Sequence, residues 1–184
     1  SDDETLNNQV TQMNSLTAAN LTYDFVDRQY VVNRDVIKEW LTQDAEGNYT
    51  IDETQAAAWV RQMAYETDTF GLAHTFKTSL GPTIELKAGG DYGWVINKDK
   101  TTAALVEAVK AGTQGAIEPV YLYSANDRSQ NDIGGTYVEI CISQQKMWCY
   151  KDGQLVVETP VVTGSHATGY DTPAGSVWAI DGKK

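Results

Sequence analysis

The stretch of sequence that decides the fold runs from Tyr137 to Gly175. It reads Tyr137-Val-Glu-Ile-Cys-Ile-Ser-Gln-Gln-Lys-Met-Trp-Cys-Tyr150, then Lys151-Asp-Gly-Gln-Leu-Val-Val-Glu-Thr-Pro-Val-Val-Thr-Gly164, and finally Thr172-Pro-Ala-Gly175. Apolar residues alternate from Val138 to Ile142, which predicts a half-buried strand. Gln144-Gln145 and Asp152-Gly153 predict tight turns, and the second is a strong hairpin signal. The stretch therefore predicts successive antiparallel strands followed by a further turn at Thr172–Gly175.

Composition places the chain among folded globular proteins. Its 184 residues are 41% hydrophobic and include five Trp and ten Tyr, which is enough for a packed core. The net charge is −11 and the four arginines are scattered, so nucleic-acid binding, which needs a basic face, is excluded. No apolar run approaches the ~18 residues of a membrane span. Ser1-Asp-Asp-Glu4 has no signal-peptide pattern, and we expect a chain cut from a longer protein at both ends.

The region before the decisive stretch predicts an α+β domain over residues 1–123. Helices are expected at about 3–14, 33–41, 50–65 and 99–111, hairpins at 21–32 and 74–87, and strands at 94–96 and 116–123. Asn33 is the expected N-cap of the second helix, Thr50 with Glu53 forms a capping box for the third, and Asp99 or Thr101 caps the fourth. Residues 124–135 are polar, end in two glycines, and predict a linker.

The order of strands and turns after residue 136 resembles the opening of the YkuD-type catalytic domain of the L,D-transpeptidases. These cysteine enzymes cross-link peptidoglycan. The resemblance implies that residues 136–184 are the first β-strands of a mostly-β domain that is truncated here. In the family, the catalytic His and a Ser-His-Gly-Cys segment lie further along the chain, so we expect this fragment alone to be inactive.

The first domain is similar to the peptidoglycan-binding domain that precedes the catalytic domain in many Gram-positive L,D-transpeptidases. Four short motifs carry this similarity: Thr67-Asp-Thr-Phe-Gly71, Thr75-Phe-Lys77, Gly90-Asp-Tyr-Gly-Trp94 and Glu118-Pro-Val-Tyr121. Each motif is short, and their occurrence in the family's order is what gives the resemblance its weight. The two resemblances together cover nearly the whole chain.

Cys141 and Cys149 both lie in the first hairpin and do not have the spacing of a metal site. A two-residue turn at Gln144-Gln145 pairs Ile140 with Cys149 and places Cys141 on the other face, which forbids a disulfide. A three-residue turn places Cys141 opposite Cys149 and permits one. The hydrophobic pattern favours the first register and export favours the second, so both stay open.

None of the titratable residues qualifies for a catalytic role. Both cysteines lie within strands, with no helix N-terminus nearby to lower a thiol pKa. His166 follows Ser165, but no Gly-Cys follows it, and we interpret it as a solvated loop residue. His74 heads a strand, and we interpret it as a structural histidine. We expect no catalytic residue, no metal and no organic cofactor in this chain.

The substrate contacts that the sequence suggests are Trp94, Tyr170 and Thr172. Trp94 could stack on a sugar ring, although core packing explains it equally well. Tyr170 and Thr172 lie at the turn that approaches the substrate groove in the family, and turn geometry alone is the alternative. The residues that carry over as family scaffold are Gly164, Pro173 and Gly175.

Two functions follow as hypotheses. In the first, the chain is part of an exported L,D-transpeptidase that cross-links stem peptides through a cysteine acyl-enzyme, with the catalytic segment beyond residue 184. In the second, it is a non-catalytic peptidoglycan-binding or scaffold module of the cell wall. The expected partners are stem peptides or glycan, at the cell wall or the outer membrane face of a Gram-positive bacterium. An anchor outside this fragment would supply any membrane contact. The incomplete sheet, with its unpaired edges, predicts self-association.

Overall fold

The computed structural model describes residues 2–180 and divides into two compact units, each discontinuous in sequence. Unit 1 is Ser1–Asp68 with Val95–Leu122, and unit 2 is Thr69–Trp94 with Tyr123–Lys184. The domain predicted over residues 1–123 and these contact units differ at residues 69–94. Residues 69–94 leave unit 1 because their buried polar groups find their partners in unit 2, as described below.

A three-stranded sheet organises unit 1, with strand order β2-β1-β8. Strands β1 (Asn20–Asp24) and β2 (Gln29–Val32) form the predicted antiparallel hairpin. Strand β8 (Gln114–Ile117) pairs with β1 in parallel. Because side chains alternate across a strand, β1 buries Leu21 and Tyr23 on one face.

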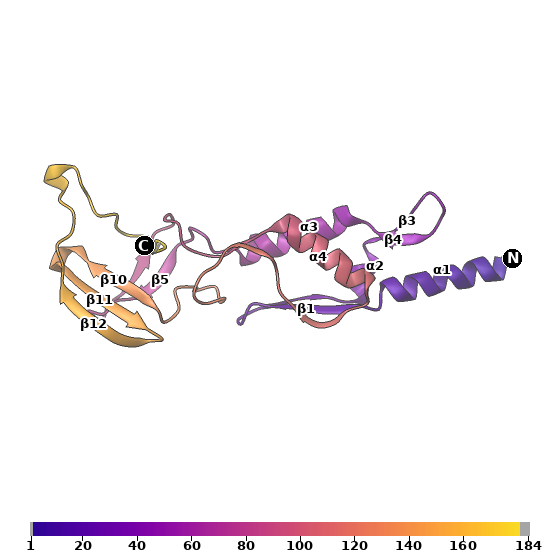
Figure 1. Ribbon diagram of the computed structural model, residues 1–184, viewed down its shortest axis with the longest axis horizontal. Helices are drawn as coiled ribbons and strands as arrows, with labels where there is room; N and C mark the ends of the chain where they lie inside the picture. The colour runs from indigo at the N-terminus through magenta and orange to yellow at the C-terminus, as the bar shows by residue number, and fades with distance from the viewer. Residues whose placement is uncertain (1, 181–184) are drawn as a thin grey trace. The chain divides into compact units, whose positions relative to one another are not determined.

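Four helices accompany this sheet: α1 (Asp2–Leu16), α2 (Arg34–Lys38), α3 (Glu53–Thr67) and α4 (Lys98–Lys110). Helices α3 and α4 lie side by side (Figure 1). The core of unit 1 is formed by the buried faces of the sheet and helices and includes Leu21, Tyr23, Phe25, Val32, Ile37, Val60, Met63, Leu105, Val106 and Val109. The mixed α+β class predicted from the patterns is confirmed.

Helix starts show where local sequence rules hold and where they fail. Asn33 caps α2 as predicted, because its side chain accepts hydrogen bonds from the backbone of the first turn. The expected capping box at Thr50 is wrong: Thr50 lies in strand β4 (Tyr49–Ile51), which pairs with β3 (Leu41–Gln43), and Asp52 caps α3 instead. Asn97 caps α4 in place of Asp99 or Thr101, which lie inside the helix.

The single strand expected at residues 116–123 is interrupted at residues 118–120. Pro119 has no N–H to give to a ladder, so β8 ends at Ile117 and β9 (Tyr121–Tyr123) begins anew, beside β7 (Val95–Ile96). Thr101 closes the gap, because its hydroxyl accepts from the N–H of Val120 at 3.0 Å.

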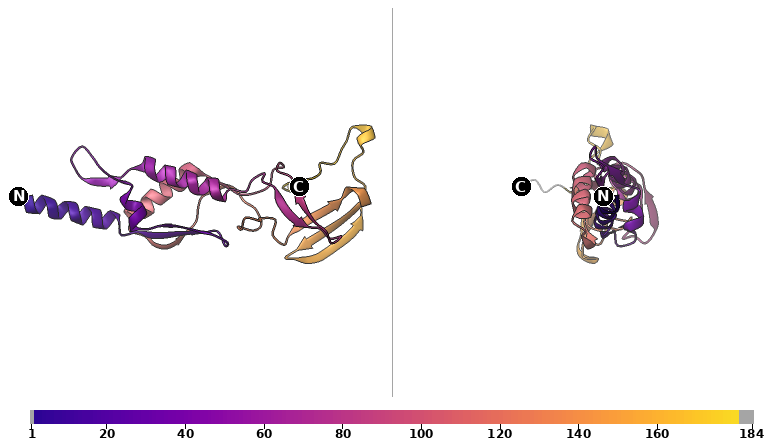
Figure 2. Two further views of the ribbon diagram at one scale, coloured as in Figure 1. Left: turned by 180° about the vertical axis from the view of Figure 1, so that it is seen from behind. Right: turned by 90° about the vertical axis from the view of Figure 1, so that its right-hand side faces the viewer.

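Unit 2 is built from a hairpin and a three-stranded antiparallel sheet. The hairpin is β5 (His74–Lys77) with β6 (Thr83–Leu86), and the sheet has the order β10 (Tyr137–Cys141), β11 (Lys146–Lys151), β12 (Gln154–Pro160). The view from behind shows the hairpin against one face of this sheet (Figure 2). The turn at Asp152-Gly153 forms as predicted, with both residues at positive φ.

The first turn of this sheet differs from both predicted forms. Residues Ile142–Gln144 form a 3-10 turn, and Gln145 takes a left-handed conformation with φ of 51°. The loop is therefore longer than two or three residues. In the register that results, strand β10 pairs with β11 so that Ile140 lies opposite Met147 and Val138 lies opposite Cys149.

Candidate functional site

A loop at the end of the sheet carries the residues predicted to contact substrate. The backbone N–H of Gly164 donates to the Thr172 hydroxyl at 2.8 Å, which closes residues 165–171 into a loop. A Cβ on Gly164 would lie 1.9 Å from the carbonyl oxygen of Tyr170, so only glycine permits this closure. Pro173 and Gly175 follow the closure, and the Gly175 carbonyl accepts from the N–H of Lys87 at 2.7 Å.

Polar and aromatic side chains of this loop face solvent. The Tyr170 side chain is 79% exposed, and the His166 ring stands in solvent with its Nδ1 2.8 Å from a carboxylate oxygen of Asp171. The arrangement agrees with the solvated role expected for His166. Tyr170 and Thr172 lie near each other in this loop, and the Thr172 hydroxyl is the group that accepts the closing hydrogen bond from Gly164.

The two thiols lie on opposite faces of the sheet and form no disulfide. Cys149 is opposite Val138 and Cys141 is opposite Lys146, so the two cysteines are three positions apart along the ladder, roughly 10 Å. Neither register weighed from the sequence occurs, because the 3-10 turn shifts the pairing. The disulfide that one of them permits is thus corrected to two free cysteines.

Neither thiol has a base beside it within the described residues. The Cys141 sulfur lies 3.4 Å from the Ser143 hydroxyl, whereas the rings of His74 and His166 are each held by an aspartate. A cysteine nucleophile requires a group that takes its proton. Residues 2–180 therefore hold no assembled cysteine–histidine pair, and they hold no cluster of three or more metal-binding side chains.

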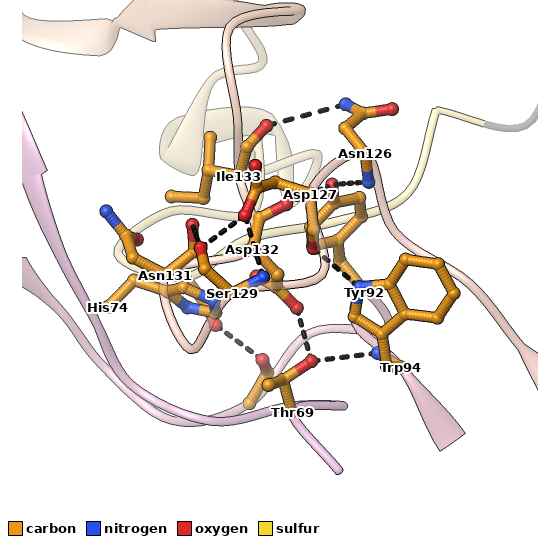
Figure 3. Close-up of polar contacts among 12 residues, drawn as sticks. Thr69, His74, Tyr92, Trp94, Asn126, Asp127, Ser129, Asn131, Asp132 and Ile133 are labelled. Atoms are coloured by element: carbon orange, nitrogen blue, oxygen red, sulfur yellow. Dashed lines mark hydrogen bonds and ion pairs between the residues drawn. The ribbon is translucent and has the colours of Figure 1, made fainter. Parts of the chain in front are cut away.

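A buried polar network ties residues 69–94 to residues 124–135 (Figure 3). At its centre is the Asp132 side chain, which is fully buried. One of its oxygens lies 2.7 Å from Nε2 of His74, and the other accepts a hydrogen bond from the Thr69 hydroxyl. The remaining ring nitrogen of His74 is also buried and has no partner among the described residues. His74 is the structural histidine that the sequence predicts.

Two aromatic residues extend this network (Figure 3). The Tyr92 hydroxyl donates to the backbone carbonyl of Asp132 at 2.9 Å and accepts from the N–H of Asn126 at 2.8 Å. The Trp94 indole N–H donates to the Asp127 carbonyl at 2.6 Å, and the Arg128 guanidinium lies 4.9 Å from the centre of its ring. Trp94 is half-buried, and the Arg128 guanidinium covers one face of its ring.

The segment expected as a linker is therefore packed. Asp132 and Ile133 are both buried, and the backbone between residues 126 and 132 folds on itself through Asp127. Sequence reasoning placed Thr69 in a family motif and Asp132 in the expected linker, and it missed their buried contact because neither polar stretch has periodicity. The available signal was Ile133, a large apolar residue inside a run otherwise typical of a loop.

A second cluster fixes the tip of the β5–β6 hairpin on the sheet. The Glu139 carboxylate accepts from the backbone N–H of Ser79 at 2.9 Å and from the Ser79 hydroxyl. That hydroxyl also shares a hydrogen bond of 2.8 Å with the Tyr150 hydroxyl. Tyr150 stacks on Tyr137 at 4.9 Å, and burial raises the pKa of Tyr137, with Tyr150 and Glu139 adding to the effect. Together these contacts cover one face of the sheet.

The other face of the sheet stays open. It carries Val138, Ile140 and Val157, each more than a third exposed. Apolar groups gathered on one surface mark a site of interaction in most soluble proteins. No helix in the described part of the chain is long and apolar enough to cross a membrane.

Comparison with known proteins shows the family to which the chain belongs. A family model described as "Putative peptidoglycan binding domain" matches residues 1–118, and the chain belongs to this family. A search of curated protein sequences gave no match.

Two solved structures relate the chain to the L,D-transpeptidases. One is a cysteine-to-serine mutant of the L,D-transpeptidase of Enterococcus faecium, with 29% identity over 91% of this chain and a TM-score of 0.70. The other is the carbamoyl enzyme that Ldtfm forms with avibactam, with 29% identity over 92% of this chain and a TM-score of 0.72. This chain spans 65% of the length of each.

Proposed function

We propose that this chain is part of an exported L,D-transpeptidase, joining its peptidoglycan-binding domain to the first portion of its YkuD-type catalytic domain. The observation that carries the proposal is the similarity to the E. faecium enzyme, which extends over 91% of this chain. At this coverage the similarity extends past residue 118, where the binding-domain family model ends, into the region that holds the sheet β10–β12.

The proposed reaction is the cross-linking of stem peptides. A cysteine thiolate attacks the carbonyl carbon of the stem residue that precedes a terminal D-residue, and the amine of that D-residue leaves with a proton. An amine of a neighbouring stem then attacks the thioester and releases the thiol. Each step needs a base for the thiol or amine and donors for the oxyanion.

The described thiols do not suit this chemistry, since Cys141 and Cys149 lie within strands and neither has a histidine beside it. We therefore propose that the acyl-enzyme forms on a segment beyond residue 184, and we expect the 184-residue chain to be inactive alone. Its contribution is a substrate-facing loop and the support beneath it.

Tyr170, Thr172 and Trp94 are the residues we propose to contact peptidoglycan. Tyr170 supports this role best, because its ring is exposed on a loop whose shape Gly164 and Thr172 fix. Trp94 offers at most one ring face, since Arg128 lies over the other. The location that follows is the outer face of a Gram-positive cell, in the wall or beside an anchored membrane segment.

The binding part is tested by sedimentation of the chain with purified insoluble peptidoglycan. We expect saturable binding that Trp94→Ala and Tyr170→Ala weaken. Tyr170→Ala is the cleaner variant, because an exposed side chain is removed without opening the core. Failure of the wild-type chain to sediment would refute peptidoglycan binding.

The enzymatic part is tested on the natural protein isolated from its source. We expect release of the terminal D-residue from tetrapeptide stems by the natural protein, and none by the 184-residue chain. The alternative is a non-catalytic wall module, favoured by the absence of a cysteine–histidine pair in the described residues. A natural protein that binds peptidoglycan without turnover would support that alternative and refute the enzyme.

A further inference from the structure

Two aromatic side chains form an exposed pair in unit 2. Phe70 is 37% exposed and Tyr123 is 59% exposed, and their ring centres lie 5.1 Å apart with 33° between the planes. At this separation the tilted rings pack on each other, and their exposed parts form one small apolar surface. A water-exposed surface of this kind gains free energy when another flat apolar group covers it.

The backbone holds Phe70 firmly. Its N–H donates to the Trp94 carbonyl at 3.3 Å, and the next N–H along the chain, of Gly71, donates to the Tyr92 carbonyl at 2.9 Å. A Cβ on Gly93 would lie 2.4 Å from Cα of Phe70, so glycine is required for this close approach. The Phe70 ring is thus positioned by the same segment that enters the buried network. Ligand binding therefore costs little free energy for ordering this backbone.

The backbone of three glycines, with Ser176 and Val177 packed against two of them, lies beside Phe70. Gly71 follows it directly, and a Cβ there would be 3.9 Å from the carbonyl oxygen of Gly90 and 4.0 Å from that of Gly89. Gly89 and Gly90 are exposed. The N–H of Gly71 already donates to Tyr92, the N–H of Gly89 donates to the Gly71 carbonyl at 2.9 Å, and the Gly89 carbonyl accepts from the Ser176 hydroxyl at 2.6 Å. This backbone is therefore fixed, and the aromatic rings are the groups that a ligand can contact.

The negative charge of the chain favours the glycan strand of peptidoglycan over the stem peptides as the ligand. The stem peptides carry carboxylates, and the chain has a net charge of −11 that disfavours them. The sugars of the glycan strand are N-acetylated, and the lactyl groups are amide-linked to the stems, so their rings are uncharged. The equatorial linkages of these sugars leave flat C–H faces that match an aromatic surface.

We propose that the Phe70–Tyr123 pair is a stacking platform for an N-acetylhexosamine ring of the glycan strand, with the backbone of Gly71, Gly89 and Gly90 beside it. The proposal rests on the proposed peptidoglycan binding and assigns it to the glycan. It adds two exposed rings to the sugar-stacking role proposed for Trp94.

The test measures binding of the full 184-residue chain to three probes: insoluble peptidoglycan, glycan strands freed of stem peptides by an amidase and with the lactyl carboxylates that the cleavage exposes capped as amides, and the stem peptides alone. The variants are Phe70→Ala, Tyr123→Ala and Tyr123→Phe. Tyr65→Ala is the matched control, because Tyr65 is 83% exposed but lies on α3 in unit 1.

We expect Tyr123→Ala and Phe70→Ala each to weaken binding to glycan strands by about tenfold, the upper end for one aromatic contact. Tyr123→Phe and Tyr65→Ala should stay within about twofold of wild type, since neither removes a ring of the platform. Thermal unfolding of each variant reports whether the fold is retained.

The outcomes separate the two proposals. Binding to insoluble peptidoglycan without binding to glycan strands would overturn the glycan platform and keep peptidoglycan binding. Glycan binding that Tyr123→Ala leaves unchanged in a folded variant would overturn the platform alone. An absence of binding to every probe would overturn both.

Discussion

Replacing Asp132 by alanine should unfold or strongly loosen unit 2 while leaving unit 1 intact. The side chain is fully buried and contacts Nε2 of His74 and the hydroxyl of Thr69. Alanine leaves both partners buried without their acceptor, and each unsatisfied group costs about 1–3 kcal/mol. The expected loss is therefore about 2–6 kcal/mol, a large part of the roughly 5–15 kcal/mol that stabilises a domain.

Asp132→Asn is the matched control for this prediction. The amide has nearly the same shape and keeps one oxygen to accept from Thr69, and its NH2 group can donate to a neutral Nε2 of His74. We therefore expect a smaller loss, about 1 kcal/mol. His74→Ala combined with Asp132→Ala should cost less than the sum of the two single changes, because they remove the same contact.

The assay must resolve the two units, since tryptophans occur in both. Hydrogen exchange followed by mass spectrometry does so, because peptides from β5 and from residues 124–135 report on unit 2, and peptides from α3 report on unit 1. We expect faster exchange in the first group alone. A loss below about 1 kcal/mol, or equal loss of protection in α3, would refute the network as the anchor of unit 2.

Three further predictions follow from other parts of the fold. Burial, with the hydrogen bond to Glu66, raises the pKa of Tyr30 to about 12, above its ordinary value of 10.0. The contribution of protonated Tyr30 to the stability of the fold is therefore complete below pH 10 and is lost as the pH rises towards 12. In urea unfolding, Tyr30→Phe should reduce the fall in the free energy of unfolding as the pH rises from 10 towards 12. An unchanged dependence on pH would contradict this. Gly164→Ala should speed exchange in residues 165–171 with little effect on global stability, because Tyr170 blocks the new Cβ. Unaltered exchange there would count against the closed loop. The open sheet face should cause concentration-dependent self-association in light scattering that Ile140→Lys abolishes, whereas a monomeric wild type would exclude it.

Local chemistry was enough to predict much of the fold. Asn33 begins α2 and Asp152-Gly153 turns β11 into β12, since each residue type has its own backbone geometry. The same reasoning failed at Thr50, where a hydroxyl suited to a cap lies in a strand. It failed again at Gln145, whose left-handed conformation lengthens a turn that two glutamines do not reveal.

The candidate site was harder to predict because its parts meet only in three dimensions. His74 and Asp132 are far apart in sequence, and no pattern in either stretch predicts that the two residues are in contact. Tyr170 and Thr172 could be singled out through the family resemblance, and their role stays a prediction. Phe70 lies in the family motif Thr67–Gly71, but nothing in the sequence pairs it with Tyr123, because that pairing follows from the fold.

The interleaving of the two units bears on how the polypeptide can assemble. Strand β1 has no parallel neighbour until β8 is synthesised, and β5 has no buried aspartate beside it until residue 132. Unit 1 is therefore completed only after the first segment of unit 2 has been made, and unit 2 only after all of unit 1. Pairings between distant segments are slow to form. A protein threaded through a membrane from its N-terminus would thus emerge with the early strands unpaired. Unit 1 would acquire its native fold first, and unit 2 would follow once the segment after residue 122 had emerged.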